Sequence, residues 1–182
     1  KGAVFGALNE RAAVGYLTLR FSEVMDVSSL RTAAITLRQT ANYTANVTVA
    51  GHPDGQNYML TSATFASDAT DSDVLVLTLG TEDLNAIKLL RGLAIDRNST
   101  ALVLNFTAVT DMKGLPVQAI TKESNQESYP GRGWMAAMVC SNYIADDTAP
   151  SLVFFMLDNN VGLIRLTFDE AVLVSTLDVT QI

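Results

Sequence analysis

The residues best suited to chemistry in this 182-residue chain are carboxylates gathered in two places. Asp68, Asp71 and Asp73 lie within one loop, and Asp146 and Asp147 precede a short proline-containing segment. Hard cations such as calcium favour clustered oxygen ligands. Their spacing matches no calcium loop pattern, however, and solvated turns explain the same residues. We therefore expect no resident cofactor, with calcium as the one candidate ion.

Other catalytic side chains are scarce. His52 is the single histidine, and it lies in a Gly/Pro turn without a nucleophile-elbow sequence. Histidine-based zinc sites need more His and Cys than the chain has. Paired carboxylates could hydrolyse glycosides on a β-sandwich, but no aromatic-rich cleft pattern accompanies them. Cys140 reads as a small buried hydrophobe, with a bridge to another chain as the alternative. We expect a protein that is not an enzyme.

Four asparagines fit the N-glycosylation acceptor pattern N-x-S/T. They are Asn42, Asn46, Asn98 and Asn105. The alternative is that some are ordinary polar positions on strand faces, above all Asn105, which follows a strongly β-like run. If the source has a secretory pathway, the pattern predicts an extracellular glycoprotein carrying N-linked glycans.

Bulk composition excludes two classes of partner. The net charge of −7 would repel nucleic acid and acidic membrane surfaces. The longest apolar run, residues 152–157, is far shorter than the roughly 20 residues that a membrane-spanning helix needs. We expect no nucleic-acid partner and no membrane insertion in this segment. The 48% hydrophobic and 17% charged residues indicate a globular chain whose surplus apolar surface could contact other chains.

The end of the chain repeats an earlier part of it. Residues 162–182 align with residues 15–35 at a constant offset of 147, with eight identities in twenty-one positions. The apolar alternation has the same phase in both copies. The sequence therefore predicts one whole repeat followed by the opening of a second, within a tandem array.

Short alternating runs separated by turns predict a β-sandwich. The first copy of the repeat shows the pattern most clearly, with Leu17, Leu19 and Phe21 on one face of a strand. One segment is instead helical: Thr81 can cap a helix that Gly92 stops. The expected strands are residues 3–8, 16–21, 34–37, 45–50, 58–65, 74–79, 100–107 and 115–120.

The remaining segments give the domain boundaries. Residues 121–132 are polar and aperiodic, which predicts a long loop, and residues 134–143 supply the final strand. Pro150 keeps the preceding residues extended. We expect a complete repeat over residues 1–146, a linker over residues 147–150, and the N-terminal part of a second repeat over residues 151–182.

Three motif groups resemble the Ig-like repeats of tandem surface proteins. They are the linker at 147–150, the strand and turn at 19–23 and 26–30, and the late turn at 108–117. With the helical segment 82–88, the chain is similar to large repeats of algal and protist mastigoneme-like surface proteins as well as to bacterial Ig-like domains. The resemblance implies an all-β fold: an Ig-like β-sandwich with one short helix, tandemly repeated. It further implies an extracellular, non-catalytic module.

The leading hypothesis is a structural repeat of an extracellular fibre or cell-surface appendage, whose partners are copies of itself or neighbouring repeats. A cell-surface adhesin or carbohydrate-binding module is the alternative, and it should show an exposed aromatic patch. A glycan-acting enzyme should show two facing carboxylates in a concave pocket. Residues 151–182 supply at most three strands, so they must be completed by further chain or by strands of another subunit.

Overall fold

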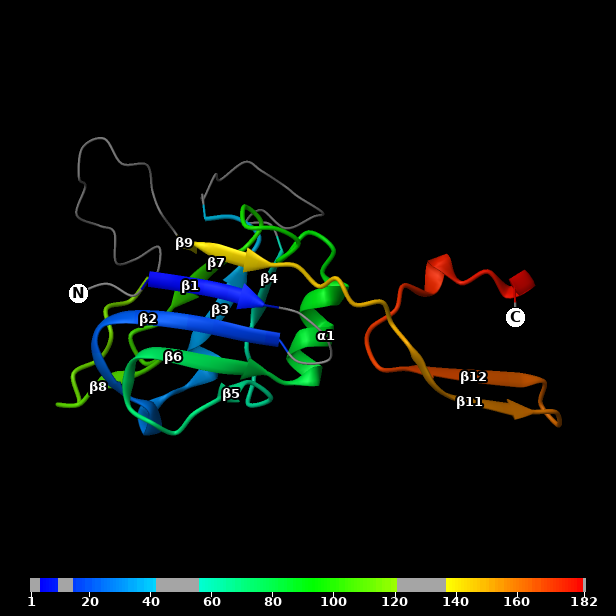
Figure 1. The fold of residues 1–182 in the computed structure, drawn as a ribbon, viewed down its shortest axis with the longest axis horizontal. Helices are drawn as coiled ribbons and strands as arrows, with labels where there is room; N and C mark the ends of the chain where they lie inside the picture. The colour runs from blue at the N-terminus through cyan, green and yellow to red at the C-terminus, as the bar shows by residue number, and fades with distance from the viewer. Residues whose placement is uncertain (1–3, 10–14, 42–55, 121–136, 182) are drawn as a thin grey trace.

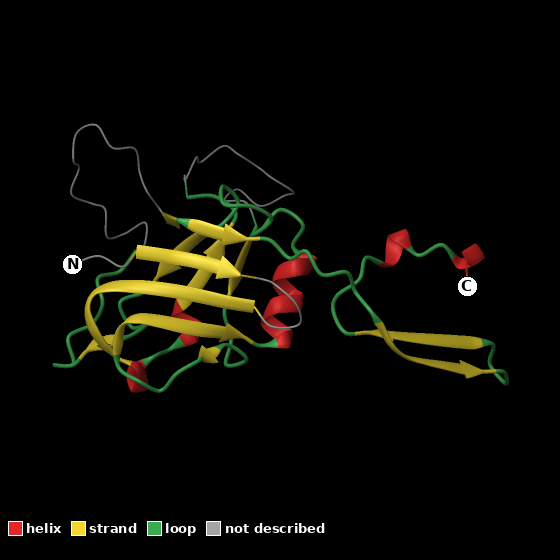
Figure 2. Ribbon diagram, viewed as in Figure 1, coloured by secondary structure: helices red, strands yellow, loops and turns green. Residues whose placement is uncertain are grey.

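The computed structural model describes residues 4–9, 15–41, 56–120 and 137–181, and it is mostly β-structure (Figures 1 and 2). A six-stranded sheet has the order β10-β1-β2-β6-β5, with β8 also paired to β2. A four-stranded sheet has the order β4-β3-β7-β9. The first sheet consists of β1 (Val4–Asn9), β2 (Gly15–Asp26), β5 (Phe65–Ala66), β6 (Ser72–Leu79), β8 (Thr110–Asp111) and β10 (Asn142–Ile144). The second consists of β3 (Ile35–Arg38), β4 (Asn57–Met59), β7 (Ala101–Leu104) and β9 (Met138–Val139).

Strand β2 shows why the two sheets pack together. Its side chains alternate as predicted: Leu17 and Leu19 are buried, whereas Tyr16 and Arg20, on the opposite face, are exposed. Leucines of β6 bury the same face of the first sheet, and apolar residues of β3 and β7 face them from the second. One apolar core therefore fills the space between the sheets, because period-two alternation directs one face of each strand inward.

Helix α1 (Thr81–Leu89) joins the two sheets, connecting β6 to the segment before β7. The predicted apolar stripe is confirmed, since Leu84 and Ile87 are buried in the core. The predicted cap is wrong: Thr81 is the first helical residue, and Gly80 is the N-cap. A Cβ at Gly80 would lie 2.2 Å from the backbone oxygen of Ala63, so only glycine allows this close approach.

Several strand boundaries differ from the prediction. Residues 58–65 are divided between β4 and β5, and residues 100–107 form a strand only as far as Leu104. Residues 115–120 contribute isolated bridges in place of a strand. The expected final strand is split into β9 and β10, which join different sheets. Residues 45–50 and the whole of the predicted loop 121–132 lie outside the described residues.

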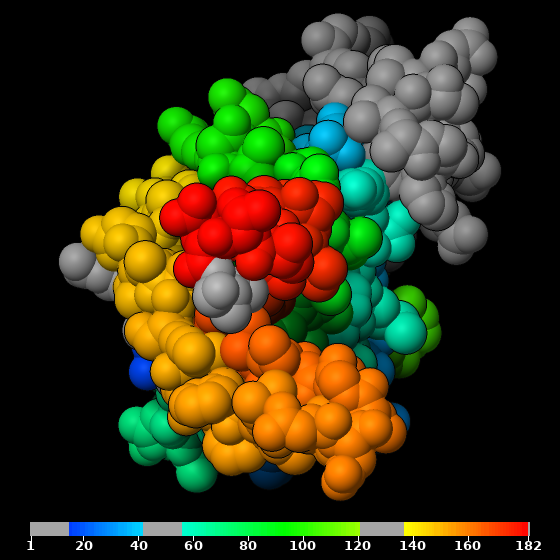
Figure 3. Space-filling view, turned by 90° about the vertical axis from the view of Figure 1, so that its right-hand side faces the viewer, coloured from blue at the N-terminus to red at the C-terminus, as the bar shows by residue number. Residues whose placement is uncertain are grey.

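The C-terminal segment, residues 151–181, is a hairpin followed by two short turns. Strands β11 (Leu152–Asp158) and β12 (Leu163–Phe168) pair antiparallel, and 3-10 turns follow at Val174–Thr176 and Val179–Gln181. Residues 163–168 are thus a strand like their counterparts in β2, as predicted. Figure 3 looks onto this end of the molecule, which the hairpin, in orange, and the turns, in red, occupy.

The hairpin is largely exposed. Val153, Phe155 and Ile164 are all more than half exposed, while Leu166 and Phe168 are half-buried. Residues 147–150 carry no regular secondary structure. No described helix is long and apolar enough to cross a membrane.

Candidate functional site at the junction

A lysine lies between two carboxylates where helix α1 meets the C-terminal segment. Lys88 Nζ donates to Asp146 Oδ2 at 2.6 Å and also to Glu170 Oε2. The three side chains are only 13%, 18% and 11% exposed, respectively. One cation therefore joins the helix, the residue before the linker and the second residue after β12.

The helix places a second contact beside this one. Asn85 precedes Lys88 by three residues and lies on the same helix face. Its Oδ1 accepts a hydrogen bond from the backbone N–H of Ala171 at 3.2 Å. Lys88 also lies in the last helical turn, where a positive charge is favourable near the carbonyl end of the helix dipole.

The linker side of the junction is fixed by local hydrogen bonds. Asp146 Oδ1 accepts from the backbone N–H of Thr148 at 3.0 Å, which leaves Oδ2 for Lys88. At the base of the hairpin, Ser151 N donates to Asp169 Oδ1 at 2.8 Å and Asp169 N donates to the Ser151 carbonyl at 3.1 Å. These short-range turns aim Asp146 and Glu170 toward the same ammonium group.

Electrostatics keeps Lys88 and Asp146 charged. Partial burial opposes the charge on Lys88, but hydrogen bonds to Asp146 and Glu170 outweigh it and raise the lysine pKa. Burial likewise acts to raise the pKa of Asp146, while hydrogen bonds from Lys88 and Thr148 lower it below the usual range. The Lys88–Asp146 ion pair is therefore present throughout the neutral range. A charge pair held this way restricts motion between the parts that it joins.

The sequence placed Asp146 just before the linker but did not indicate Lys88. The lysine is 58 residues from one carboxylate and 82 from the other, so no local pattern links them. A lysine in the last turn of a helix, three residues after an asparagine, is too common to single out.

The repeat alignment gives Glu170 a counterpart in the first copy. Glu23 occupies the same repeat position, in the irregular stretch of β2 between Arg20 and Met25 where pairing with β6 is interrupted. This stretch and β8 lie at one end of the molecule, whereas α1 and the linker lie at the other end of the same sheets (Figure 1).

A second cluster centres on Asp83, whose side chain is fully buried in the first turn of α1. Its Oδ1 accepts from Tyr58 Oη and Thr61 Oγ1, both at 2.8 Å. Its Oδ2 accepts from Thr61 N at 3.0 Å and Thr64 Oγ1 at 2.5 Å. Burial acts to raise the pKa of Asp83, but these hydrogen bonds lower it below the usual range. Burial, then the contact with Asp83, raises the pKa of Tyr58 to about 12.

The hydroxyl and backbone donors around Asp83 indicate a structural role. Tyr58 belongs to β4, and Thr61 and Thr64 lie in the connection between β4 and β5, so the carboxylate ties these segments to the start of α1. A buried anion with four donors is satisfied and is stabilised further by the helix N-terminus.

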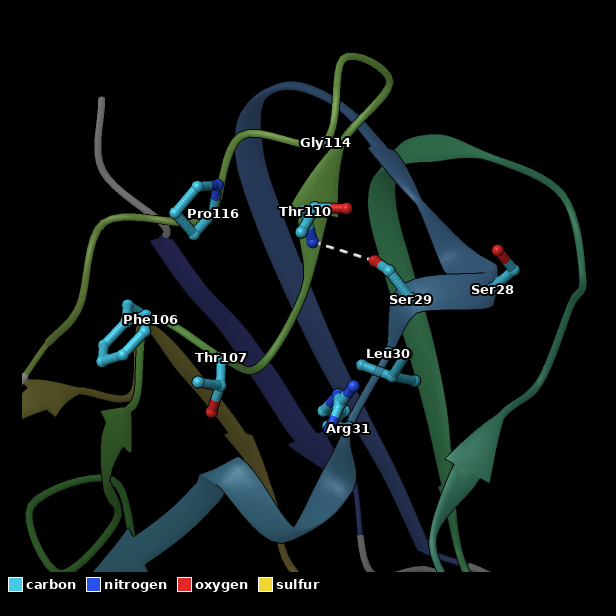
Figure 4. Close-up of a pocket in the computed structure, with 9 residues that line it drawn as sticks. All are labelled: Ser28, Ser29, Leu30, Arg31, Phe106, Thr107, Thr110, Gly114 and Pro116. Carbon is cyan, nitrogen blue, oxygen red and sulfur yellow. Dashed lines mark hydrogen bonds between the residues drawn. The ribbon is translucent and has the colours of Figure 1, made fainter.

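A hollow of about 490 Å³ lies near β8, at the end of the sheets away from α1 (Figures 1 and 4). Hydroxyl groups, Arg31 and the exposed ring of Phe106 contribute to its surface, and the backbone N–H of Thr110 donates to Ser29 Oγ at 2.8 Å beside it. The lining residues are Ser28, Ser29, Leu30, Arg31, Phe106, Thr107, Thr110, Gly114 and Pro116. None of these carries a carboxylate.

The aspartates proposed for calcium hold backbone turns. Asp71 Oδ1 accepts from Val27 N at 2.9 Å, and Asp68 Oδ1 accepts from the backbone and hydroxyl of Thr70, which lowers the pKa of Asp68. Within the described residues, no three His, Cys, Asp or Glu side chains are grouped to hold a metal ion. Calcium binding stays a prediction.

The remaining candidates are placed in part. Cys140 is fully buried in the core, as its simpler interpretation predicts. Asn98 and Asn105 are exposed, and Asn105 lies in a turn after β7, not on a strand face: its Oδ1 accepts from Thr107 N at 3.0 Å. His52, Asn42 and Asn46 lie outside the described residues.

Comparisons with known proteins identify no relative. No family model matches the chain, and neither a curated protein nor a solved structure matches it significantly.

Proposed function

We propose that this chain is a structural repeat module of an extracellular fibre or cell-surface appendage, built from Ig-like β-sandwiches joined end to end. The observation that carries the proposal is the junction, where Lys88 is held by a carboxylate on each side of the linker. A purely flexible connection would need no such clamp. Restricting the angle between neighbouring modules is what a fibre requires of its repeats.

Repetition of local structure supports the tandem arrangement. The turns at Val27–Ser29 and Thr32–Ala34 recur at Val174–Thr176 and Val179–Gln181, each at the 147-residue offset. Even a side-chain contact recurs. Ser29 Oγ donates to the carbonyl of Asp26 at 2.6 Å, and its counterpart Thr176 Oγ1 donates to the carbonyl of Leu173 at 2.7 Å.

The geometry of the two ends favours a linear array. The helix surface that contacts Glu170 lies at one end of the sheets, and the irregular stretch of β2 that contains Glu23, the counterpart of Glu170, lies at the other (Figure 1). A contact between unlike ends of identical modules is a head-to-tail contact. It forms a closed ring only if the rotation from one module to the next brings the last module back to the first. Repeating the Lys88 junction would therefore extend a chain of modules along one direction.

Distance measurements across the junction test its rigidity. Spin labels at cysteines replacing the exposed Asp73 and Asn159 report the separation between the first sheet and the hairpin tip. We expect one narrow distance distribution for the otherwise unchanged chain, and at least a doubling of its width in Lys88→Met. Lys113→Met, which removes a lysine from an exposed turn, is the matched control and should leave the width unchanged. Equal widths in all three proteins would contradict the clamp.

Electron microscopy of native material tests the function itself. We expect filaments with a regular axial repeat, and we expect the protein to be exposed on or outside the cell. Dispersed particles, or an intracellular location, would refute a fibre role even if the junction proved rigid.

The adhesin alternative has one feature in its favour, the hollow that exposes Phe106 beside Arg31 and several hydroxyl groups. Aromatic rings and hydroxyls are groups that bind sugars. A glycan array probed with the chain and with Phe106→Ala distinguishes the two functions. Binding that the substitution abolishes would favour recognition over a purely structural role.

A further inference from the structure

Strand β12 has one edge paired with β11 and one edge that no described strand covers. In the described residues β12 pairs only with β11, whereas its counterpart β2 pairs with β1 on one side and with β6 on the other. A strand edge with unpaired N–H and C=O groups is a template for another strand.

Burial shows what this edge lacks. Leu17 in β2 is 0% exposed, and Ile164, at the same repeat position in β12, is 52% exposed. Both side chains lie on the apolar face of their strand, and their cross-strand partners are also leucines: Leu8 for Leu17 and Leu157 for Ile164. The difference therefore arises from neighbours beyond the hairpin and not from the hairpin itself.

We propose that the open edge of β12 binds an extended segment with the sequence pattern of β6, supplied by a repeat of this same kind. The pairing is antiparallel. In β2, Gly15, Leu17 and Leu19 face Leu79, Leu77 and Leu75 of β6. The 147-residue offset transfers this register to Gly162, Ile164 and Leu166. The inference rests on the repeat arrangement of the proposed function and names its partner.

The sequence of β6 suits this edge. Leu75, Leu77 and Leu79 are buried on one face, and the residues between them are less buried, so the added strand would extend the apolar face of the hairpin. Within a folded repeat, β6 already lies between β2 and β5. A folded copy would have to break its own first sheet to release β6. The occupant is therefore a β6-type segment that is not yet part of a sheet.

Titration of the ¹⁵N-labelled 182-residue chain with a synthetic peptide of residues 71–80 tests the pairing. We expect amide shifts in β12 and little change in the first sheet. A nitroxide on the N-terminus of the peptide should broaden the amide of Thr167, and one on its C-terminus should broaden Gly162. A control peptide with Leu75, Leu77 and Leu79 replaced by serine should bind at least tenfold more weakly.

Two single variants locate the binding face. Ile164→Asp, on the apolar face, should weaken binding at least tenfold. Leu163→Asp changes a neighbour of similar exposure on the opposite face, and it should bind as the unchanged chain does. First-sheet amides that keep their positions show that each variant retains the rest of the fold.

Three results would overturn the inference: no shifts in β12 at millimolar peptide, broadening in the reverse order, or equal binding of the serine peptide. Filaments and a narrow junction distance with no peptide binding would refute strand addition and leave the proposed function standing. Peptide binding together with dispersed native particles would support strand addition and refute the proposed fibre function.

Discussion

Removing the carboxylate of Asp83 should destabilise the protein strongly. In Asp83→Ala, the hydroxyl of the buried Thr64 loses its acceptor, and so does the part-buried backbone N–H of the more exposed Thr61. An unsatisfied buried donor costs roughly 1–3 kcal/mol. The hydroxyl of the less buried Tyr58 can turn to solvent and adds little. One buried donor without an acceptor, together with the lost charge-assisted bonds, should lower the free energy of unfolding by about 2–4 kcal/mol.

The variant Asp83→Asn separates geometry from charge. Its amide group can donate to the hydroxyls of Tyr58 and Thr61, and its oxygen can still accept from Thr61 N and Thr64 Oγ1. All partners are kept, but the charge-assisted strength is lost, so the cost should be about 1–2 kcal/mol. Asp68→Asn, at an exposed turn carboxylate whose pKa is also lowered, is the matched control and should change stability least.

Equilibrium denaturation between pH 2.5 and 7 measures both effects. The folded-state pKa of Asp83 is below its unfolded value of about 3.9. Its contribution is therefore present above about pH 4 and is lost as the pH falls through the folded pKa. Asp83→Asn should lack this part of the acid dependence. If Asp83→Ala lies within 1 kcal/mol of the unchanged protein, or if Asp83→Asn has the same acid slope, the assigned role is wrong.

Two further predictions concern the backbone and the surface. Gly80→Ala forces a Cβ against the Ala63 carbonyl oxygen and should lower the unfolding free energy by about 1–3 kcal/mol in the same denaturation assay; adding Ala63→Gly should not restore it, because the obstacle is a main-chain atom. In material from a eukaryotic secretory source, Asn98 and Asn105 should carry glycans, and the intact mass should drop after endoglycosidase treatment. Replacing both asparagines by glutamine should remove the part of the mass loss that their glycans contribute. A peptide map in which Asn98 and Asn105 are both unmodified would refute the prediction.

Local patterns predicted the elements whose signal lies within a few residues. The alternation around Leu17 predicted β2, and the apolar stripe of Leu84 and Ile87 predicted the packing face of α1. Predictions failed where interactions outside the local pattern determine the structure. Residues 100–107 have β-propensity throughout. The side chain of Asn105, however, accepts a hydrogen bond from the backbone N–H of Thr107, and β7 ends at the preceding residue, Leu104.

The junction lay beyond any local pattern for a related reason. Asp146 could be placed beside the linker, because it directly precedes it in sequence. Lys88 reaches Asp146 and Glu170 only through the position of α1 against the linker, which the packing of both sheets determines.

The similarity between residues 15–35 and 162–182 was readable from the sequence alone, and so was the strand near the start of each segment. What the sequence did not decide is the environment of equivalent residues. Leu17 and Ile164 share a repeat position and a strand face, yet one is fully buried and the other is half exposed. Burial is a property of the neighbours that surround a side chain, and β6 and the second sheet stand beside Leu17 but not beside Ile164. Only the tertiary structure could show that difference.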